Sequence, residues 1–288
     1  MPELTNPRAE RVRSVRALAG RPARLRSGRF LVEGPQSVRE LVREQPAAVA
    51  ELYLTDEAVG RHADIVGAAA AAGLPHRTGT PEVLAAMSPD AQGVVAVARA
   101  RPLSLADVLE RRPGLVALLA RVRDPGNAGA VIRAADAAGA QAVVLTSESV
   151  DPHNPKVVRS TAGSLFHLPV VTGVGLEEAV DALRSAGLLV LAADGTGEHD
   201  LDDLLDVAGT GPRDAPDLAA PTAWLLGNEA WGLPQEDRAR ADAVVRVPIH
   251  GRAESLNLAT AATVLLYASA RAQRRRGGRA SDDGPQDG

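Results

Sequence analysis

Residues 115–138 read LVALLARVRDPGNAGAVIRAADAA, in which an apolar run leads through a Pro-Gly turn into an Ala-rich segment. A short apolar run bounded by turn residues predicts a buried strand, and the Ala-rich segment predicts a helix. Apolar runs of the same kind recur at 142–146, 188–193, 222–226 and 243–247. Buried strands that alternate with helices belong to parallel sheets, so residues 113–276 are predicted to form one α/β domain.

A smaller domain precedes this one. Strand-like patterns lie at 29–33, 51–55 and 94–99, and helical patterns lie between and before them at 8–18, 37–44 and 57–72. We therefore expect a small α/β sandwich over residues 8–100. The remaining segments are expected to be a flexible arm at 1–7, a Pro-bounded linker at 101–112 and a disordered tail at 277–288.

The composition excludes several kinds of site. The chain has no cysteine, which rules out disulfides and thiolate-bound zinc or iron–sulfur centres. The six histidines lack the spacing of metal ligands, so no metal site is predicted. Aromatic residues make up 2% of the chain, which disfavours rows of base-stacking rings. No apolar run approaches the ~20 residues of a membrane span and no secretory signal is present, so we expect a cytoplasmic protein without membrane contact.

The charge is unevenly distributed along the chain. The net charge is −4, yet residues 8–43 carry ten Arg against three acids. Such a segment can bind a polyanion locally, or it can be a solvated face in a chain that is rich in Arg throughout. We expect phosphate contacts, above all from the Pro- and Gly-containing loop at 20–28. The run of Arg at 271–279 is a second candidate of the same kind.

Common nucleotide-binding and nucleophile motifs are absent from the sequence. There is no GxGxxG fingerprint, no GxxxxGK[ST] phosphate loop and no GxSxG elbow. A nicotinamide-dependent enzyme, a P-loop NTPase and a serine hydrolase are therefore disfavoured. What remains is a set of three polar loops that follow predicted strands, which is where open α/β sheets place their ligands.

These three loops span 121–136, 224–234 and 247–259, and each holds a few residues that could act chemically. Taken singly, each also has a structural explanation as a helix cap or as a tight turn. The residues concerned are Asn127 and Arg133 in the first loop, Gly227, Glu229 and Gly232 in the second, and Ser255 and Asn257 in the third.

Together the three loops resemble, in order, spacing and residue type, the motifs of the SpoU/TrmH family of RNA ribose 2′-O-methyltransferases in the SPOUT superfamily. Between the first two, DPHNPKVVRSTAGSLF at 151–166 resembles a further block of that family, and the likeness covers about residues 113–272. FLVEG at 30–34 resembles the family's substrate-binding domain, whose fold is shared with a class of ribosomal proteins. The chain departs from the family at Thr161, where Ser is usual, and at Ala230 and Trp231, where a smaller or charged pair is common.

The resemblance implies a mostly parallel sheet with flanking helices, whose C-terminal segment threads through a loop to give a trefoil knot. It also implies S-adenosyl-L-methionine as the cofactor and a homodimer formed through the C-terminal domain. Arg133 would act at the ribose hydroxyl, from the opposite protomer. The implied catalytic residues are Arg133, Asn127, Glu229, Ser255 and Asn257. The implied cofactor-binding residues are Leu226, Gly227, Asn228, Val247, Ile249, Leu256 and Ala259. The residues expected to bind RNA are Arg21, Arg24, Arg26, Arg29 and Arg159.

The predicted function is therefore methylation of a ribose 2′-hydroxyl in ribosomal RNA, with the large subunit favoured. The separate Arg-rich N-terminal domain favours ribosomal RNA over transfer RNA, although a tRNA methyltransferase stays open. A catalytically silent RNA-binding protein of the same fold is another alternative, and the complete set of motif residues argues against it. An enzyme that binds a small nucleotide is disfavoured because the glycine fingerprint is missing.

Overall fold

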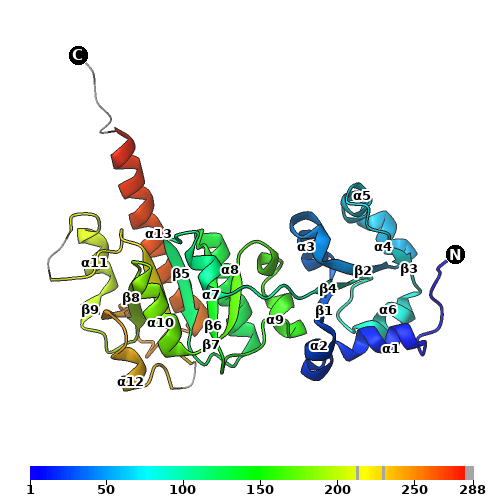
Figure 1. Ribbon diagram of the computed structural model, residues 1–288, viewed down its shortest axis with the longest axis horizontal. Helices are drawn as coiled ribbons and strands as arrows, with labels where there is room; N and C mark the ends of the chain where they lie inside the picture. The colour runs from blue at the N-terminus through cyan, green and yellow to red at the C-terminus, as the bar shows by residue number, and fades with distance from the viewer. Residues whose placement is uncertain (212–213, 229–230, 283–288) are drawn as a thin grey trace, which may run out of the picture. The chain divides into compact units, whose positions relative to one another are not determined.

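The computed structural model describes residues 1–211, 214–228 and 231–282. The chain folds into two compact units, each with its own sheet (Figure 1). Unit 1 consists of Met1–Pro102 and Asp151–His167, and unit 2 consists of Leu103–Val150 and the chain from Leu168 onward. The chain therefore passes between the units three times, and a short segment from the middle of the sequence belongs to the N-terminal unit.

The sheet of unit 1 has four strands in the order β1-β4-β2-β3, and β4 runs antiparallel to both of its neighbours. Helices α1 and α6 lie below this sheet in Figure 1, and α3 and α5 lie above it. Val12 and Val15 of α1 and Leu84 of α6 share one buried cluster with Leu31 and Val97 of the strands. The expected α/β sandwich is therefore present.

The elements of unit 1 have the following bounds. The strands are β1 (Arg29–Glu33), β2 (Val49–Leu54), β3 (Arg77–Thr78) and β4 (Val94–Arg99). The helices are α1 (Glu10–Ala17), α2 (Arg21–Ser27), α3 (Pro35–Glu44), α4 (Asp56–Arg61), α5 (Ala63–Ala71), α6 (Pro81–Met87) and α9 (Pro155–Ser160), with short 3-10 turns η1 (Pro46–Ala48) and η2 (Ser164–Phe166).

Unit 2 contains a seven-stranded sheet in the order β7-β6-β5-β10-β8-β11-β9, and every neighbouring pair is parallel. The strands are β5 (Leu115–Leu119), β6 (Ala142–Thr146), β7 (Val170–Val174), β8 (Leu189–Ala193), β9 (His199–Asp200), β10 (Thr222–Leu226) and β11 (Ala243–Arg246). The helices are α7 (Leu105–Leu109), α8 (Pro125–Ala138), α10 (Leu176–Ser185), α11 (Leu201–Val207), α12 (Gln235–Arg238) and α13 (Leu258–Asp282).

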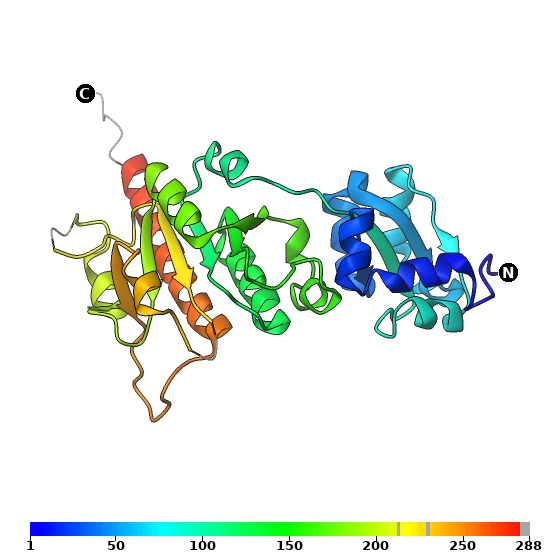
Figure 2. The ribbon, with the colours of Figure 1, turned by 60° about the horizontal axis from the view of Figure 1, so that its bottom comes forward.

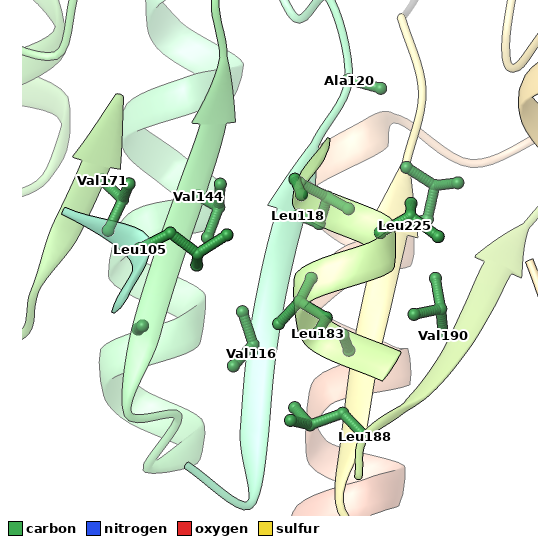
Figure 3. Close-up of a cluster of buried hydrophobic side chains, with 14 of the residues drawn as sticks. Leu105, Val116, Leu118, Ala120, Val144, Val171, Leu183, Leu188, Val190 and Leu225 are labelled. Carbon is green, nitrogen blue, oxygen red and sulfur yellow. The ribbon is translucent and has the colours of Figure 1, made fainter. Parts of the chain in front are cut away.

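Alternate residues of the central strands point to opposite faces of this sheet and build a core on each face. On one face, Leu225 of β10 packs in a cluster with Leu183 of α10 and Leu105 of α7 (Figure 3). On the other face, α8 and α13 pack against each other and against β5. There the indole Nε1 of Trp224 donates to Ser269 Oγ at 3.0 Å. Burial on both faces explains why these strands read as continuous apolar runs.

The apolar runs identified in the sequence are strands of these two sheets. The bounds of β1, β4, β6 and β10 match the prediction, and those of β2, β5, β8 and β11 differ from it by one or two residues. Three strands were not expected. Two of them, β3 and β9, have only two residues each, and β7 has the sequence VVTGV, in which Thr and Gly interrupt the apolar pattern.

Both ends of the chain differ from the prediction. Residues 1–7 are not a free arm, because Leu4 pairs with the edge of the sheet: its N–H donates to Thr78 O and its carbonyl accepts from Thr80 N, each at 3.0 Å. A single backbone pairing leaves no apolar pattern that the sequence could reveal. At the other end, α13 continues to Asp282, so residues 277–282 are helical where a disordered tail was expected, and residues 283–288 lie outside the described part.

Segments expected to be irregular contain helices. The predicted linker at 101–112 includes α7, which begins with a capping box at Ser104 and buries Leu105 and Val108 in the core of unit 2. The predicted loop at 20–28 is α2: Pro22 lies in its first turn and Gly28, with a φ of 62°, ends it. Proline at the start and glycine just past the end are compatible with a helix, so these residues bound α2 and do not break it.

The parallel pairing and the flanking helices confirm the predicted fold class. The threading of the C-terminal segment through a loop stays a prediction. In the described ranges, no helix combines the length and the apolar character needed to span a membrane.

Candidate functional site

The ends of β8, β10 and β11 open onto a cavity of about 430 Å³ in unit 2. These are the carboxyl ends of parallel strands, where open α/β sheets place ligands. The segment between β11 and α13 leaves the sheet as a long loop (Figure 2) and supplies another part of the wall. Eight residues predicted from the sequence line this cavity: Leu226, Gly227, Asn228, Val247, Ile249, Ser255, Leu256 and Asn257.

The loop that follows β10 closes on itself beside the cavity. Asn228 N donates to Gly232 O at 3.2 Å, and Gly232 N donates to Asn228 O at 2.9 Å. A Cβ on Gly227 would lie 2.6 Å from the carbonyl carbon of Gly232. Gly227 is therefore required because the loop approaches its own backbone, as in the tight turn considered for this loop. The loop is also anchored to the first motif loop, which follows β5, since Asn228 Nδ2 donates to Arg121 O at 3.0 Å.

The first and third motif loops meet through two asparagines. Asn257 Nδ2 donates to Asn127 Oδ1 at 3.0 Å. Asn257 also caps α13, because its Oδ1 accepts from Ala259 N at 2.9 Å. Asn127 is thus joined to the wall of the cavity by a side-chain contact between residues 130 positions apart.

The residues that cap the two helices are Asp124 and Asn257, not Asn127 and Ser255. Asp124 caps α8 by accepting from Asn127 N at 2.8 Å, so Asn127 lies in the first turn and its side chain is available to Asn257. Ser255 does not cap the last helix, because α13 begins at Leu258 and Asn257 caps it. Ser255 is an exposed loop residue that lines the cavity, and Ala259 lies in the first turn of α13 outside the lining.

The two remaining predicted catalytic residues are Glu229 and Arg133. Glu229 lies outside the described residues. Arg133 is exposed on α8, six positions after Asn127, and does not line the cavity. Within the described ranges, Arg133 makes no hydrogen bond or ion pair. Its charged group is therefore free to meet a ligand or another chain.

Asp194 places a carboxylate in the cavity wall that the sequence analysis missed. Burial raises the pKa of Asp194, but hydrogen bonds from Thr196 and Arg238 outweigh it and hold the pKa below its usual value. Thr196 Oγ1 donates at 2.6 Å and an Arg238 guanidinium nitrogen donates at 3.1 Å. The wall therefore contains an ionised carboxylate, which pairs with Arg238. Asp194 directly follows the apolar run of β8, so its place at a strand end was the signal available.

Arg121 connects several of the segments around the cavity. It has a φ of 55°, a strained conformation for a residue other than glycine, and its guanidinium pairs with the buried Asp237. Its N–H donates to Thr146 Oγ1 at 3.0 Å. Because its carbonyl accepts from Asn228, this one residue connects β6, α12 and the second motif loop.

The arginines of residues 8–43 divide into two groups. Five of the ten make ion pairs within unit 1: Arg11, Arg24, Arg29, Arg39 and Arg43. The other five are exposed and make no ion pair with any residue that the structure describes: Arg8, Arg13, Arg16, Arg21 and Arg26.

Arg24 does not fit the expected role in binding RNA. Its side chain is only 6% exposed and pairs with Asp151 at 2.7 Å. It also donates to Leu18 O at 3.0 Å and to Ala19 O at 2.7 Å. The sequence could not reveal this role, because Asp151 lies 127 positions away. Two of the other expected residues, Arg29 and Arg159, are partly exposed but already pair with carboxylates, whereas Arg21 and Arg26 remain available.

Two sequence blocks that were identified separately are partners in unit 1. Arg159 of the 151–166 block pairs with Glu33 of the 30–34 block, and the rings of His153 and Phe30 lie with centroids 4.2 Å apart. Burial lowers the pKa of His153. Next to these contacts is a second cavity, of about 540 Å³, whose wall includes Arg16 and Lys156. Unit 1 thus has a hollow with basic residues at its wall.

Two family models match the chain, one for each of these regions. A model described as the SpoU rRNA Methylase family matches residues 114–267, and one described as RNA 2′-O ribose methyltransferase substrate binding matches residues 31–103.

Individual proteins are similar over different shares of the chain. The 23S rRNA (uridine(2479)-2′-O)-methyltransferase of Streptomyces viridochromogenes is 40% identical over 173 residues, which span 58% of this chain and 57% of that protein. The 23S rRNA (guanosine(2553)-2′-O)-methyltransferase RlmP of Bacillus subtilis is 31% identical over 274 residues, 93% of this chain and 98% of that protein. Among solved structures, the SpoU methyltransferase AviRb from Streptomyces viridochromogenes in complex with AdoMet has a TM-score of 0.77 and 32% identity, covering 93% of this chain and 99% of its own.

Proposed function

The chain belongs to the SpoU rRNA methylase family, and on that premise we propose that it transfers a methyl group from S-adenosylmethionine to a ribose 2′-hydroxyl in large-subunit ribosomal RNA. The observation that carries the proposal is the cavity of unit 2, where residues of two motif loops line one edge of the sheet and Asn127 joins them from the third. Ribosomal RNA is favoured because the matched relatives are named as 23S rRNA methyltransferases.

The cavity fits the cofactor in volume and in chemistry. Its volume of about 430 Å³ lies within the ~300–1,000 Å³ of typical small-molecule sites. Leu226, Val247 and Leu256 offer apolar surface to a flat adenine ring, and the carboxylate of Asp194 offers a negative charge to a cationic ligand. When bound, S-adenosylmethionine supplies a methyl group activated by a positively charged sulfur.

The task of the protein is to hold the ribose hydroxyl in line with that methyl group. Fixing two reactants in a reactive orientation can supply several orders of magnitude in rate. Asn127 and Asn257 hold each other, so their side chains form a rigid polar element between the cavity and α8. We assign them to orienting the nucleotide, together with Ser255 and with Glu229, which stays a prediction from the sequence.

Arg133 acts on the acceptor side of the reaction. An arginine side chain remains protonated at neutral pH, so it cannot serve as the base that removes the hydroxyl proton. We assign Arg133 to binding the phosphate next to the target nucleotide and to polarising the 2′-hydroxyl. The phosphate or a water molecule then accepts the proton.

We further propose a homodimer through unit 2, in which Arg133 serves the cavity of its partner. The support is its place on α8, exposed and away from the cavity of its own chain. The neighbouring helix α13 leaves Val264 and Tyr267 partly exposed, and Tyr267 Oη donates to Ala137 O of α8 at 3.2 Å. These side chains give the two helices an apolar surface that a second copy would cover.

Unit 1 supplies the affinity for RNA in this proposal. The arginines without ion pairs on α1 and α2, namely Arg13, Arg16, Arg21 and Arg26, are exposed and suit phosphate contacts. We also propose a cytoplasmic location, because the proposed substrate is ribosomal RNA.

The test is methyl transfer from tritiated S-adenosylmethionine to large-subunit rRNA isolated from a strain that lacks the gene. We expect one labelled nucleotide whose 3′ bond resists alkaline hydrolysis, as a 2′-O-methylated ribose requires. Label in transfer RNA instead would favour the tRNA alternative. Cofactor binding without transfer to either RNA would favour the silent RNA-binding protein.

A further inference from the structure

Most of the few aromatic side chains of this protein are buried in its two cores, and Trp231 is the clearest exception. The chain has two Trp, two Tyr and two Phe, and four of these six side chains are buried. Tyr267 is partly exposed but tied down by its hydrogen bond to Ala137 O. Trp231 is 61% exposed, whereas Trp224 is fully buried in β10. A large exposed indole in so aromatic-poor a chain suggests a role outside the core.

The indole of Trp231 has a cationic neighbour. The guanidinium carbon of Arg123 lies 5.9 Å from the centroid of the ring, within the ~6 Å at which a cation is attracted to an aromatic face. Arg123 is itself exposed, and it forms no ion pair inside the described ranges. A planar cation beside an open aromatic ring is the combination that takes up both the phosphate and the base of a single-stranded nucleotide.

The position of the pair connects it to the acceptor side of the site. Arg123 directly precedes Asp124, the cap of α8, which carries Asn127 and Arg133. Trp231 directly precedes Gly232, which closes the second motif loop and lines the cofactor cavity. Trp231 itself does not line that cavity, so its ring is not part of the adenine pocket.

We propose that Trp231 and Arg123 form a stacking platform for a nucleobase of the RNA substrate, next to the nucleotide that is methylated. This proposal rests on the proposed function and adds to it a determinant of this chain, because Trp231 is one of the positions where the sequence departs from its family. It also amends the expectation from composition: recognition is by backbone and shape over most of the surface, with one base held by stacking. Every base has an aromatic face, so the platform selects unpaired nucleotides and no particular base.

The main competitor for this surface is a second copy of the chain. An exposed indole alone would fit that role equally well. The charge of Arg123 favours RNA, because burying an unpaired guanidinium in a protein interface is costly whereas a phosphate would neutralise it.

Fluorescence of the full-length protein can observe the platform directly. Trp231→Phe keeps an aromatic face and leaves the buried Trp224 as the only indole, so it is the matched control. We expect that octaadenylate shields wild-type fluorescence from iodide quenching, and that an octamer of abasic ribose phosphate, which has the charges but no bases, does not. The Trp231→Phe variant should respond to neither RNA. Equal shielding by the abasic octamer would overturn the proposal, as would an indole that is already shielded without RNA and becomes accessible only when the protein is diluted to monomer.

Methyl transfer provides the second measurement. Loss of one stacked base lowers affinity roughly 5- to 150-fold, so we expect Trp231→Ala to reduce kcat/KM for the large-subunit rRNA by that factor while Trp231→Phe stays within about threefold of wild type. Cofactor affinity and melting temperature should be unchanged in both variants. Wild-type transfer with an unaffected Trp231→Ala variant overturns the platform alone, whereas absence of wild-type transfer overturns the proposed function.

Discussion

The basic segment of unit 1 and the first motif loop of unit 2 differ in how their arginines are paired. In unit 1, half of the arginines in residues 8–43 are paired with carboxylates, and Arg24 is buried in such a pair. In the first motif loop of unit 2, Arg121 pairs with Asp237, whereas Arg123 and Arg133 are exposed and make no ion pair with any described residue. An unpaired guanidinium is available to phosphate, whereas a paired one first has to be released from its carboxylate. The number of positive charges in a segment therefore overstates the number of phosphate contacts that it can make with RNA.

The largest effect should follow from Arg133→Ala. The assignment of Arg133 to the acceptor side means that it contributes mainly in the transition state, where loss of one stabilising group typically lowers kcat by roughly 100- to 1,000-fold. Cofactor affinity, measured by calorimetry, should stay within about twofold of wild type. Loss of cofactor binding in a folded Arg133→Ala variant would place this residue in the cofactor site and contradict its assignment to the acceptor side.

Two glycines that line the cavity, Gly227 and Gly195, can separate a structural role from a role in facing the ligand. The Cβ of Gly227→Val would meet the backbone of Gly232 at 2.6 Å, so we expect the loop to open, with a loss of about 1–3 kcal/mol in stability and of cofactor binding. Gly195→Ala is the matched control, because Gly195 also lines the cavity but a Cβ there meets nothing within 4 Å. Its melting temperature should equal that of wild type. An unchanged melting temperature for Gly227→Val would contradict the steric argument.

Arg24 and Arg26 test the comparison within one helix. Arg24→Ala leaves Asp151 without its partner in a partly buried site, which should cost about 3 kcal/mol of stability. Arg26→Ala removes an exposed charge and should leave stability unchanged. In filter binding, Arg26→Ala should lower RNA affinity and flatten the salt dependence by roughly 0.7–0.9 for each phosphate that the protein no longer neutralises. A larger change of the salt slope for Arg24→Ala than for Arg26→Ala would reverse the assignment.

The sequence predicted most of the fold because its strands are buried on both faces. Runs such as those of β5 and β10 are apolar along their whole length, and turn residues bound them clearly. The errors fall where structure depends on single contacts: the backbone pairing of Leu4, the capping box at Ser104 and the conformation of Gly28. Such contacts leave no periodic pattern, and proline and glycine are compatible with helix ends as well as with loops.

The candidate cofactor cavity was predictable for a different reason. The motif loops have characteristic residues at fixed spacing, and six of the seven expected cofactor residues line the cavity. Asp194 was missed because it stands alone after a strand, without a motif around it. The role of Arg24 was missed because it depends on Asp151. This residue lies 127 positions away in the sequence and becomes part of unit 1 only when the chain folds.

The smallest expected effect is a dependence of unit 1 on pH through His153. Burial lowers the pKa of His153 from its ordinary value of 6.5; Arg24 acts in the same direction, and Asp151 partly opposes it. The folded state therefore favours the neutral ring, and the unfolded chain binds more protons between the two pKa values. The stabilisation is fully present above pH 6.5 and is lost as the pH falls below it.

Hydrogen exchange of residues 151–160, corrected for intrinsic rates, should be faster at about pH 5.5 than at about pH 7.5. In His153→Gln, whose side chain does not titrate, this difference should disappear, while His250→Gln, which changes an exposed imidazole of unit 2, should leave it intact. The same pH dependence in His153→Gln would assign the titration to another group.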